Sequence, residues 1–184
     1  MDLNRQIMET NFFGALRTIQ KVIPDMKKRR SGRIINIGSI GSIIGLSFID
    51  GYCASKFALE GLSESLVAVL KAFDVHISNV IFGPVKTSFL VGLGANTNMN
   101  EDAVDQETLE LLKRNLRLSL ENPQVADRIP SVEHAAEVIV RVIEDPSPKL
   151  RYTDREESKE FVSIKLKDLS GESVVAHQMK YFET

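Results

Sequence analysis

The chain has 184 residues, a formal net charge of −2 and one cysteine, Cys53. The length suits one domain with its own core, the charge gives no reason to expect a nucleic-acid partner, and a lone cysteine excludes an internal disulfide. No apolar run is long enough to span a bilayer, and the polar, amphipathic start is unlike a secretory signal. These observations predict a cytoplasmic protein with a single domain, residues 1–184, and leave peripheral membrane association open.

Residues 3–29 carry apolar side chains mostly three or four positions apart, the spacing of a long amphipathic helix. Four cations, Lys27 to Arg30, follow its last apolar residue, and Gly32 comes after them. Cations in a last turn complement the helix dipole, and glycine is a common helix stop. We therefore interpret the basic quartet as a helix end, and rank a localisation signal or a membrane patch well below it.

Two apolar, β-branched runs, residues 33–37 and 76–82, have the pattern of strands buried on both faces of a parallel sheet. A second long helix is predicted between them, over residues 52–73. Helix, strand, helix and strand in this order, with short connections, predict an α/β fold with a Rossmann-like, doubly wound parallel sheet. Ser39 then falls at the carboxyl end of a central strand, the edge at which such sheets bind ligands.

The second half of the chain is less regular. Residues 88–105 form a loop rich in glycine and asparagine, and a loop of this length in a compact domain is often a lid or binding segment. We assign residues 88–130 to a substrate-loop region. The pattern predicts helices over 106–120, 131–144 and 155–169, with Ser131 as an N-cap, and a short edge strand over 150–153.

Ser39, Tyr52 and Lys56 are the candidate catalytic residues. Tyr52 and Lys56 are four residues apart and therefore share one face of a helix. A free phenol, with a pKa of about 10, is a poor acid or base at neutral pH, and a nearby ammonium favours the phenolate and lowers that pKa. Tyr52 can then donate a proton to a carbonyl or accept one from an alcohol, while Ser39 bonds the same oxygen. The hydride must come from a cofactor.

Each of these residues alone has an ordinary explanation: a packed phenol, a solvated lysine, a serine that caps a turn. Their combined spacing favours catalysis, and four stretches then resemble the short-chain dehydrogenase/reductase family: NFFGALR, GRIINIGSIGSIIG, YCASKFALEGLSESL and GPVKTSF. The resemblance covers nearly the whole chain and is greatest to the branch that acts on 17β-hydroxysteroids and retinol. It implies an oxidoreductase that uses NAD or NADP to interconvert a lipophilic alcohol, a steroid or a retinoid, and its ketone or aldehyde. It also implies a homodimer in which the two long helices pack across a two-fold axis.

The resemblance assigns roles residue by residue. Ser39 resembles the serine that orients the substrate, Tyr52 the acid/base that contacts substrate and cofactor, and Lys56 the lysine that binds the nicotinamide ribose. Asn11 resembles the asparagine that kinks its helix and supports a proton-relay water; otherwise it is an ordinary polar helix residue. A segment after the second strand resembles the one that contacts the nicotinamide carboxamide, although its glycine and proline could also form a plain turn: Gly83, Pro84, Val85 and Thr87.

The resemblance also implies parts that this sequence lacks. The family begins with a strand and a T-G-x-x-x-G-x-G turn that holds the cofactor pyrophosphate, and no such turn precedes Asn11. We therefore expect the chain to be a C-terminal portion, at least two βαβ units short, with an incomplete cofactor site and a pairing-prone sheet edge. Two hypotheses remain: an oxidoreductase in its intact form, and a truncated, catalytically silent chain that acts as an interaction or dimerisation module.

Overall fold

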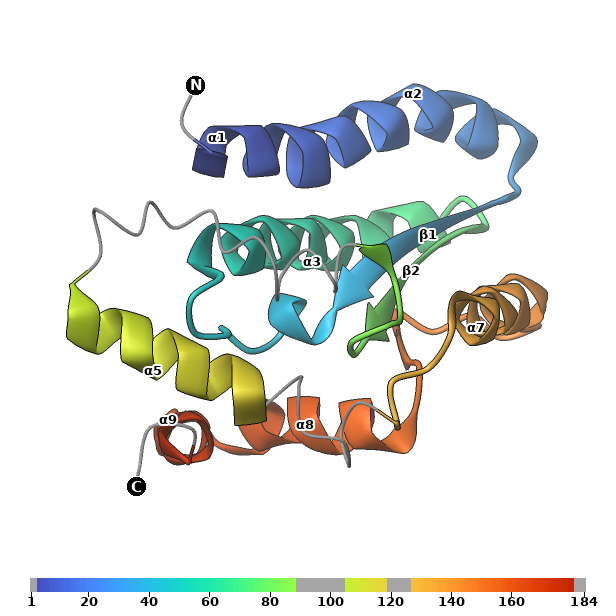
Figure 1. Ribbon diagram of the computed structural model, residues 1–184. Coiled ribbons are helices and arrows are strands. Elements are labelled where there is room, and N and C mark those ends of the chain that lie inside the picture. Colours follow the sequence, from blue (N-terminus) through green and yellow to red (C-terminus); the bar gives the residue numbers. More distant parts are fainter. Residues whose placement is uncertain (1–2, 89–104, 119–126, 181–184) are drawn as a thin grey trace.

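The computed structural model describes residues 3–88, 105–118 and 127–180 (Figure 1). Most of the expected substrate-loop region, residues 89–104 and 119–126, lies outside the described residues. Within them, helices cover both faces of a small parallel sheet: α1, α2 and α3 lie on one side of the strands, α7 lies on the other, and α8 lies at the carboxyl edge (Figure 1). This confirms the α/β fold with a parallel sheet.

The first long helix contains an irregular turn that its sequence pattern did not reveal. It consists of α1 (Leu3–Met8), the π-helical segment η1 (Glu9–Phe13) and α2 (Gly14–Arg29). The backbone N–H of Gly14 donates to the carbonyl of Glu9, which marks the wider π turn. Asn11 lies inside this segment, at the position where a π turn changes the direction of the side chains before it.

The end of α2 corrects one expectation, because Arg30 and not Gly32 caps the helix. Arg30 adopts the left-handed conformation, with φ of 51°, and its N–H donates to the carbonyls of Lys27 and Met26. Its guanidinium donates to the Ala72 carbonyl at 2.9 Å, and the Lys27 ammonium lies 4.1 Å from the centre of the Phe73 ring. These contacts support the helix-end interpretation of the basic quartet. Gly32 instead begins the next strand, against Met26.

The sheet has three parallel strands in the order β1-β2-β3, namely β1 (Gly32–Ser39), β2 (Val75–Phe82) and β3 (Arg151–Thr153). Ser39 is in register with Phe82, and Ile81 with Thr153, so all three strands end at the same edge. Strand β2 is central and almost wholly buried. Among the described residues no strand pairs with the other side of β1, where Ile37 is 46% exposed.

The core follows the alternation of side chains along β2. On one face, α2 and α3 (Asp50–Lys71) pack over the strands around a cluster of Ile19, Ile34, Leu70, Val75 and Ile77. On the other, Val80 and Phe82 pack against Val138 and Val142 of α7 (Val132–Glu144). A third cluster, Ile43, Ile44, Ile81 and Val162, joins the carboxyl edge of the sheet to α8 (Glu156–Lys167).

Local capping explains where several shorter elements begin. Ser131 caps α7 by accepting a hydrogen bond from the N–H of His134, as its sequence position predicts. Asp105 caps α5 (Gln106–Leu116) in the same way through Thr108. Asp168 accepts from the backbone of Ser170 and Ser173 where α9 (Glu172–Met179) starts. No helix of the described residues combines the length and the apolar character that crossing a membrane requires.

Candidate active site

Ser39 ends β1 and begins the short 3-10 helix η2 (Ile40–Ser42), which holds it rigidly. Its hydroxyl oxygen accepts a hydrogen bond from the N–H of Gly41 at 3.1 Å. Its own N–H donates to the hydroxyl oxygen of Ser42 at 3.0 Å, and the Ser42 hydroxyl donates back to the Ser39 carbonyl. Ser39 is therefore a turn-capping serine, and the same constraints fix its hydroxyl at the carboxyl edge of the sheet.

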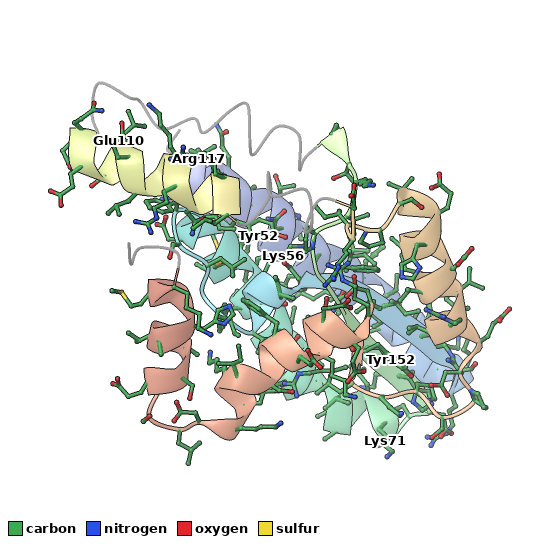
Figure 2. All side chains as sticks on the ribbon, turned by 60° about the horizontal axis from the view of Figure 1, so that its bottom comes forward. Tyr52, Lys56, Lys71, Glu110, Arg117 and Tyr152 are labelled. Atoms are coloured by element: carbon green, nitrogen blue, oxygen red, sulfur yellow. The ribbon has the colours of Figure 1, made fainter. Side chains whose placement is uncertain are left out.

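Tyr52 and Lys56 project from the first turns of α3 toward that edge, and Figure 2 shows them beside each other. The Tyr52 ring and the Ser39 hydroxyl line the same space, because a Cβ added to Gly41 would lie 3.4 Å from an atom of each. The Lys56 ammonium lies 5.7 Å from the centre of the Tyr52 ring and donates to the Ile37 carbonyl at 2.9 Å. The structure thus brings the three predicted catalytic side chains together, from a strand end and from one face of a helix.

The charge state of Tyr52 differs from the sequence-based expectation. Burial raises the pKa of the phenol above its ordinary value, and the hydrogen bond from Ser39 only partly opposes it. Burial also lowers the pKa of the Lys56 ammonium. The expectation that Lys56 brings the Tyr52 pKa below its ordinary value is therefore wrong for this structure, because burial of the phenol has the largest effect on its pKa. A protonated phenol next to a hydroxyl is a proton donor held in place.

Asn11 contacts the helix that carries Tyr52, and does so through a serine that the sequence analysis missed. The Asn11 amide donates to the hydroxyl oxygen of Ser55 at 3.0 Å, and the Ser55 hydroxyl donates to the Tyr52 carbonyl at 2.7 Å. Ser55 is fully buried. Its position, three residues after Tyr52 and on the side of α3 that faces η1, was the available signal. The chain Asn11–Ser55–Tyr52 ties the π turn to the start of α3.

The segment from Gly83 to Thr87 continues β2 beyond the same edge of the sheet. Because Phe82 is in register with Ser39, this segment begins next to the serine. Val85 packs against the α7 cluster, and the N–H of Lys86 donates to the Pro130 carbonyl at 2.9 Å. The structure therefore places the predicted cofactor segment at the edge that carries Ser39, Tyr52 and Lys56.

A family model described as short chain dehydrogenase matches residues 2–98, which is more than half of the chain. The chain belongs to the short-chain dehydrogenase family. Within that family, it belongs to the branch that includes 17-beta-hydroxysteroid dehydrogenase type 1 and retinol dehydrogenase 8. The human 17-beta-hydroxysteroid dehydrogenase type 1 is 37% identical to it over 175 residues, 95% of this chain and 52% of the relative. Human retinol dehydrogenase 8 is 38% identical over 168 residues, 91% of this chain and 54% of the relative.

This short-chain dehydrogenase chain spans about half the length of the curated relatives that it matches. Solved structures agree with the fold. A short-chain dehydrogenase from Streptomyces avermitilis matches with a TM-score of 0.65 at 21% identity, and covers 96% of this chain and 62% of its own. One from Burkholderia cenocepacia, solved in complex with NADP, matches with a TM-score of 0.66 at 20% identity, over 96% of this chain and 59% of its own.

The residues at the sheet edge fit one half of a nicotinamide dinucleotide. The Lys56 ammonium and the Tyr52 phenol are donors suited to ribose hydroxyls, and they lie at the edge where the backbone from Gly83 to Thr87 begins. A pyrophosphate is usually held by a glycine-rich turn between a strand and a helix, and the T-G-x-x-x-G-x-G form of that turn does not occur in this sequence. The described residues also contain no group of His, Cys, Asp and Glu side chains able to hold a metal ion.

The sequence analysis also missed a polar network on the face of α3 that carries Tyr52 and Lys56. Glu60 follows Lys56 by one helical step of four and is 6% exposed. One of its carboxylate oxygens accepts from the Asn79 amide at 2.5 Å, and the other pairs with the guanidinium of Arg151 at 2.5 Å. Arg151 also pairs with Glu64, one further step along α3. The steps of four from Tyr52 to Glu64 were a signal for this stripe.

Two further buried side chains extend the network to β1. The Ser63 hydroxyl donates to the Asn79 side-chain oxygen at 2.8 Å, and the Asn36 amide donates to the Ser63 hydroxyl oxygen at 2.9 Å. All three are at most 7% exposed. Since buried polar groups cost free energy unless they are paired, this set favours one position of α3 on the sheet. That position is the one that directs Tyr52 and Lys56 at the end of β1.

Proposed function

We propose that this chain supplies the catalytic part of an NAD(P)-dependent oxidoreductase that interconverts a lipophilic alcohol and its ketone or aldehyde. The observation that carries the proposal is the proximity of Ser39 and Tyr52 at the carboxyl edge of the sheet, with the Lys56 ammonium beside the ring. A bound nicotinamide would supply or accept the hydride. The chain's own residues handle the proton and the position of the reacting oxygen.

In this proposal Tyr52 and Ser39 act on the same substrate oxygen. The Tyr52 phenol carries its proton at neutral pH and donates it to a carbonyl oxygen, and the Lys56 ammonium beside the ring stabilises the phenolate that remains. The Ser39 hydroxyl, fixed by its capping bonds, orients that oxygen. Lys56 and the backbone from Gly83 to Thr87 would hold the ribose and carboxamide of the cofactor. Asn11 supports the site through Ser55.

The names of the relatives guide the substrate class. Relatives at 37% and 38% identity are a 17-beta-hydroxysteroid dehydrogenase and a retinol dehydrogenase, so we infer a steroid or a retinoid as substrate. We further infer a homodimer that forms through the surfaces of α1, α2 and α3. We also infer a cytoplasmic location, which is compatible with peripheral contact with a membrane. NAD and NADP are both candidates for the cofactor.

A test of this proposal compares Tyr52→Phe with Tyr152→Phe in the protein that carries these residues together with any upstream sequence that its reading frame encodes. The assay follows oxidation of NADH and NADPH with a 17-keto steroid and with retinal. Removing a general acid typically costs about 10²–10⁴-fold, so we expect a loss of that order for Tyr52→Phe. Tyr152 bonds Asp145, the residue after α7, and is distant from Tyr52 in Figure 2, so its substitution should leave turnover unchanged. Equal turnover of both variants and the parent would contradict the assignment.

The 184 residues contain no T-G-x-x-x-G-x-G pattern, which favours a second candidate function. In it, the 184-residue chain is catalytically silent and acts as an interaction or dimerisation module. Titration of the purified chain with NADH and NADPH tests the silent module. We expect no tight binding by the chain alone, and micromolar binding would refute the silent module.

A further inference from the structure

Two residues that follow β3, the buried Asp154 and the partly buried Arg155, form an ion pair beside the segment from Gly83 to Thr87. The N–H of Asp154 donates to the Ile81 carbonyl at 3.3 Å, which extends the pairing of β2 and β3 by one residue. The Asp154 side chain is fully buried, and one of its carboxylate oxygens accepts from the guanidinium of Arg155 at 3.1 Å. A buried carboxylate needs such a partner, because an unpaired charge is costly in the interior.

The same two side chains bind the backbone of the segment on either side of its first peptide bond. The other carboxylate oxygen of Asp154 accepts from the N–H of Gly83 at 3.3 Å. The Arg155 guanidinium donates to the Pro84 carbonyl at 3.3 Å. The ion pair therefore satisfies one donor and one acceptor of the segment, and proline offers no N–H of its own.

The close approach of α8 explains why residue 83 is glycine. A Cβ added to Gly83 would lie 2.7 Å from a guanidinium nitrogen of Arg155 and 2.8 Å from the hydroxyl oxygen of Ser158. Either distance is far too short for a real contact. A side chain at this position would push Arg155 away from the backbone that it binds. Gly83 and Pro84 are thus more than a plain turn, because their conformation is set by the residues after β3.

We propose that Asp154 and Arg155 are positioning residues that hold the Gly83–Pro84 backbone in the conformation that receives the nicotinamide half of the cofactor. They act through the backbone, on the side of the segment that packs against α8. This inference rests on the proposed function, since it assigns a role in the binding of that cofactor. The competing explanation is that the pair only stabilises the fold, like any other buried ion pair.

Arg33 provides a matched control. Its guanidinium also donates to two backbone carbonyls, those of Val142 at 3.1 Å and Asp145 at 2.6 Å. It lies at the start of β1, whereas Asp154 and Arg155 lie at the opposite edge of the sheet. Arg33→Ala therefore removes the same kind of interaction without contact to Gly83 or Pro84.

The first experiment measures hydrogen exchange of the Gly83 amide by NMR in the 184-residue chain. Arg155→Ala and Asp154→Asn should accelerate this exchange by about tenfold or more, the loss of a hydrogen bond to a charged group, relative to Arg33→Ala. Arg155→Lys keeps a cation beside Asp154 but loses the forked donor, so the Gly83 amide should exchange at an intermediate rate. If Arg155→Ala fails to fold, the exchange rate in Arg155→Lys tests the proposal instead. An exchange rate equal to that of Arg33→Ala overturns the proposal.

The second experiment measures KM for NADH and NADPH in the longer protein. We expect KM to rise about tenfold in Arg155→Ala with a smaller change in kcat, and to stay unchanged in Arg33→Ala. Faster Gly83 exchange with an unchanged KM overturns the role in cofactor binding. A parent protein without turnover or cofactor binding refutes the proposed function instead, and the exchange experiment still decides whether the pair positions the segment.

Discussion

Lys56 on α3 donates a hydrogen bond to the carbonyl of Ile37, two residues before Ser39 on β1. This bond joins the helix that carries the phenol to the strand that carries the serine, so it sets the distance between them. One of the three ammonium N–H groups donates in this bond, and the other two can donate to a ligand. The lysine is therefore a structural link in the site as well as its cation.

Lys56→Met should destabilise the chain because the Ile37 carbonyl loses its charged donor. We expect a decrease of about 1.5–3 kcal/mol in the free energy of unfolding, measured by urea denaturation. Lys71→Met, at the exposed end of the same helix (Figure 2), should stay within about 0.5 kcal/mol of the parent. Similar losses in both variants would show that the Ile37 bond contributes little.

Ser39→Ala should raise the pKa of Tyr52 still further, because the hydrogen bond from Ser39 is the contact that opposes burial. Titration of ¹³C-labelled tyrosine by NMR measures this pKa directly. Ser42→Ala is the control: it removes the other half of the capping box but leaves the Ser39 hydroxyl in place. Each variant should also cost about 1 kcal/mol of stability through the lost cap. An unchanged Tyr52 titration in Ser39→Ala would contradict the proposed pairing.

Glu60→Ala should cost more stability than most substitutions on α3, because it leaves Arg151 and Asn79 without their buried partner. We expect a loss of about 3–5 kcal/mol in urea denaturation. Glu64→Ala, whose carboxylate is 51% exposed, should cost less than about 1 kcal/mol. The double variant Glu60→Leu/Arg151→Met should lose less than the sum of the single variants, since no unpaired charge remains. Additive losses would show that the two side chains act independently.

Asp168 should give the chain a measurable acid sensitivity. Hydrogen bonds from Ser170 and Ser173 hold the pKa of its carboxyl well below the ordinary value. For a depressed pKa, the stabilisation is fully present above the unfolded value of about 3.9 and is lost as the pH falls toward the folded value. Asp168→Asn should therefore flatten the decline of unfolding free energy below pH about 4. The same decline in Asp168→Asn and in the parent would refute this origin.

Hydrophobic periodicity was sufficient to predict β1, β2, α3 and α7, because each buries one regular stripe or a continuous apolar run. It was not sufficient for features that depend on tertiary packing. The Glu60–Arg151 pair joins residues 91 positions apart, and no local pattern relates them. The direction of the Tyr52 pKa shift follows from how deeply the fold buries the phenol, which the spacing of Tyr52 and Lys56 does not determine.

In the candidate site, too, local pattern predicts some residues and tertiary packing determines others. Ser39, Tyr52 and Lys56 were predictable because their positions along a strand and a helix place them at one edge. The roles assigned to Asn11 and to the Gly83 segment came from family resemblance and stay predictions. The sequence analysis missed Ser55, Asp154 and Arg155 because each bonds a backbone atom of another residue. Such a contact does not depend on the partner's residue type, so no sequence motif indicates it.

The π turn at Glu9–Phe13 makes the first helix sensitive to length. A π turn contains one residue more than an α turn, so α1 is rotated by about 100° around the axis relative to a regular helix. This rotation brings the Asn4 amide against Gly51, the residue before Tyr52, so closely that a Cβ on Gly51 would overlap it. Deleting a single residue from this turn would carry Asn4 to another side of the helix. The number of residues between Asn4 and Gly14 thus decides which side chains of α1 meet α3.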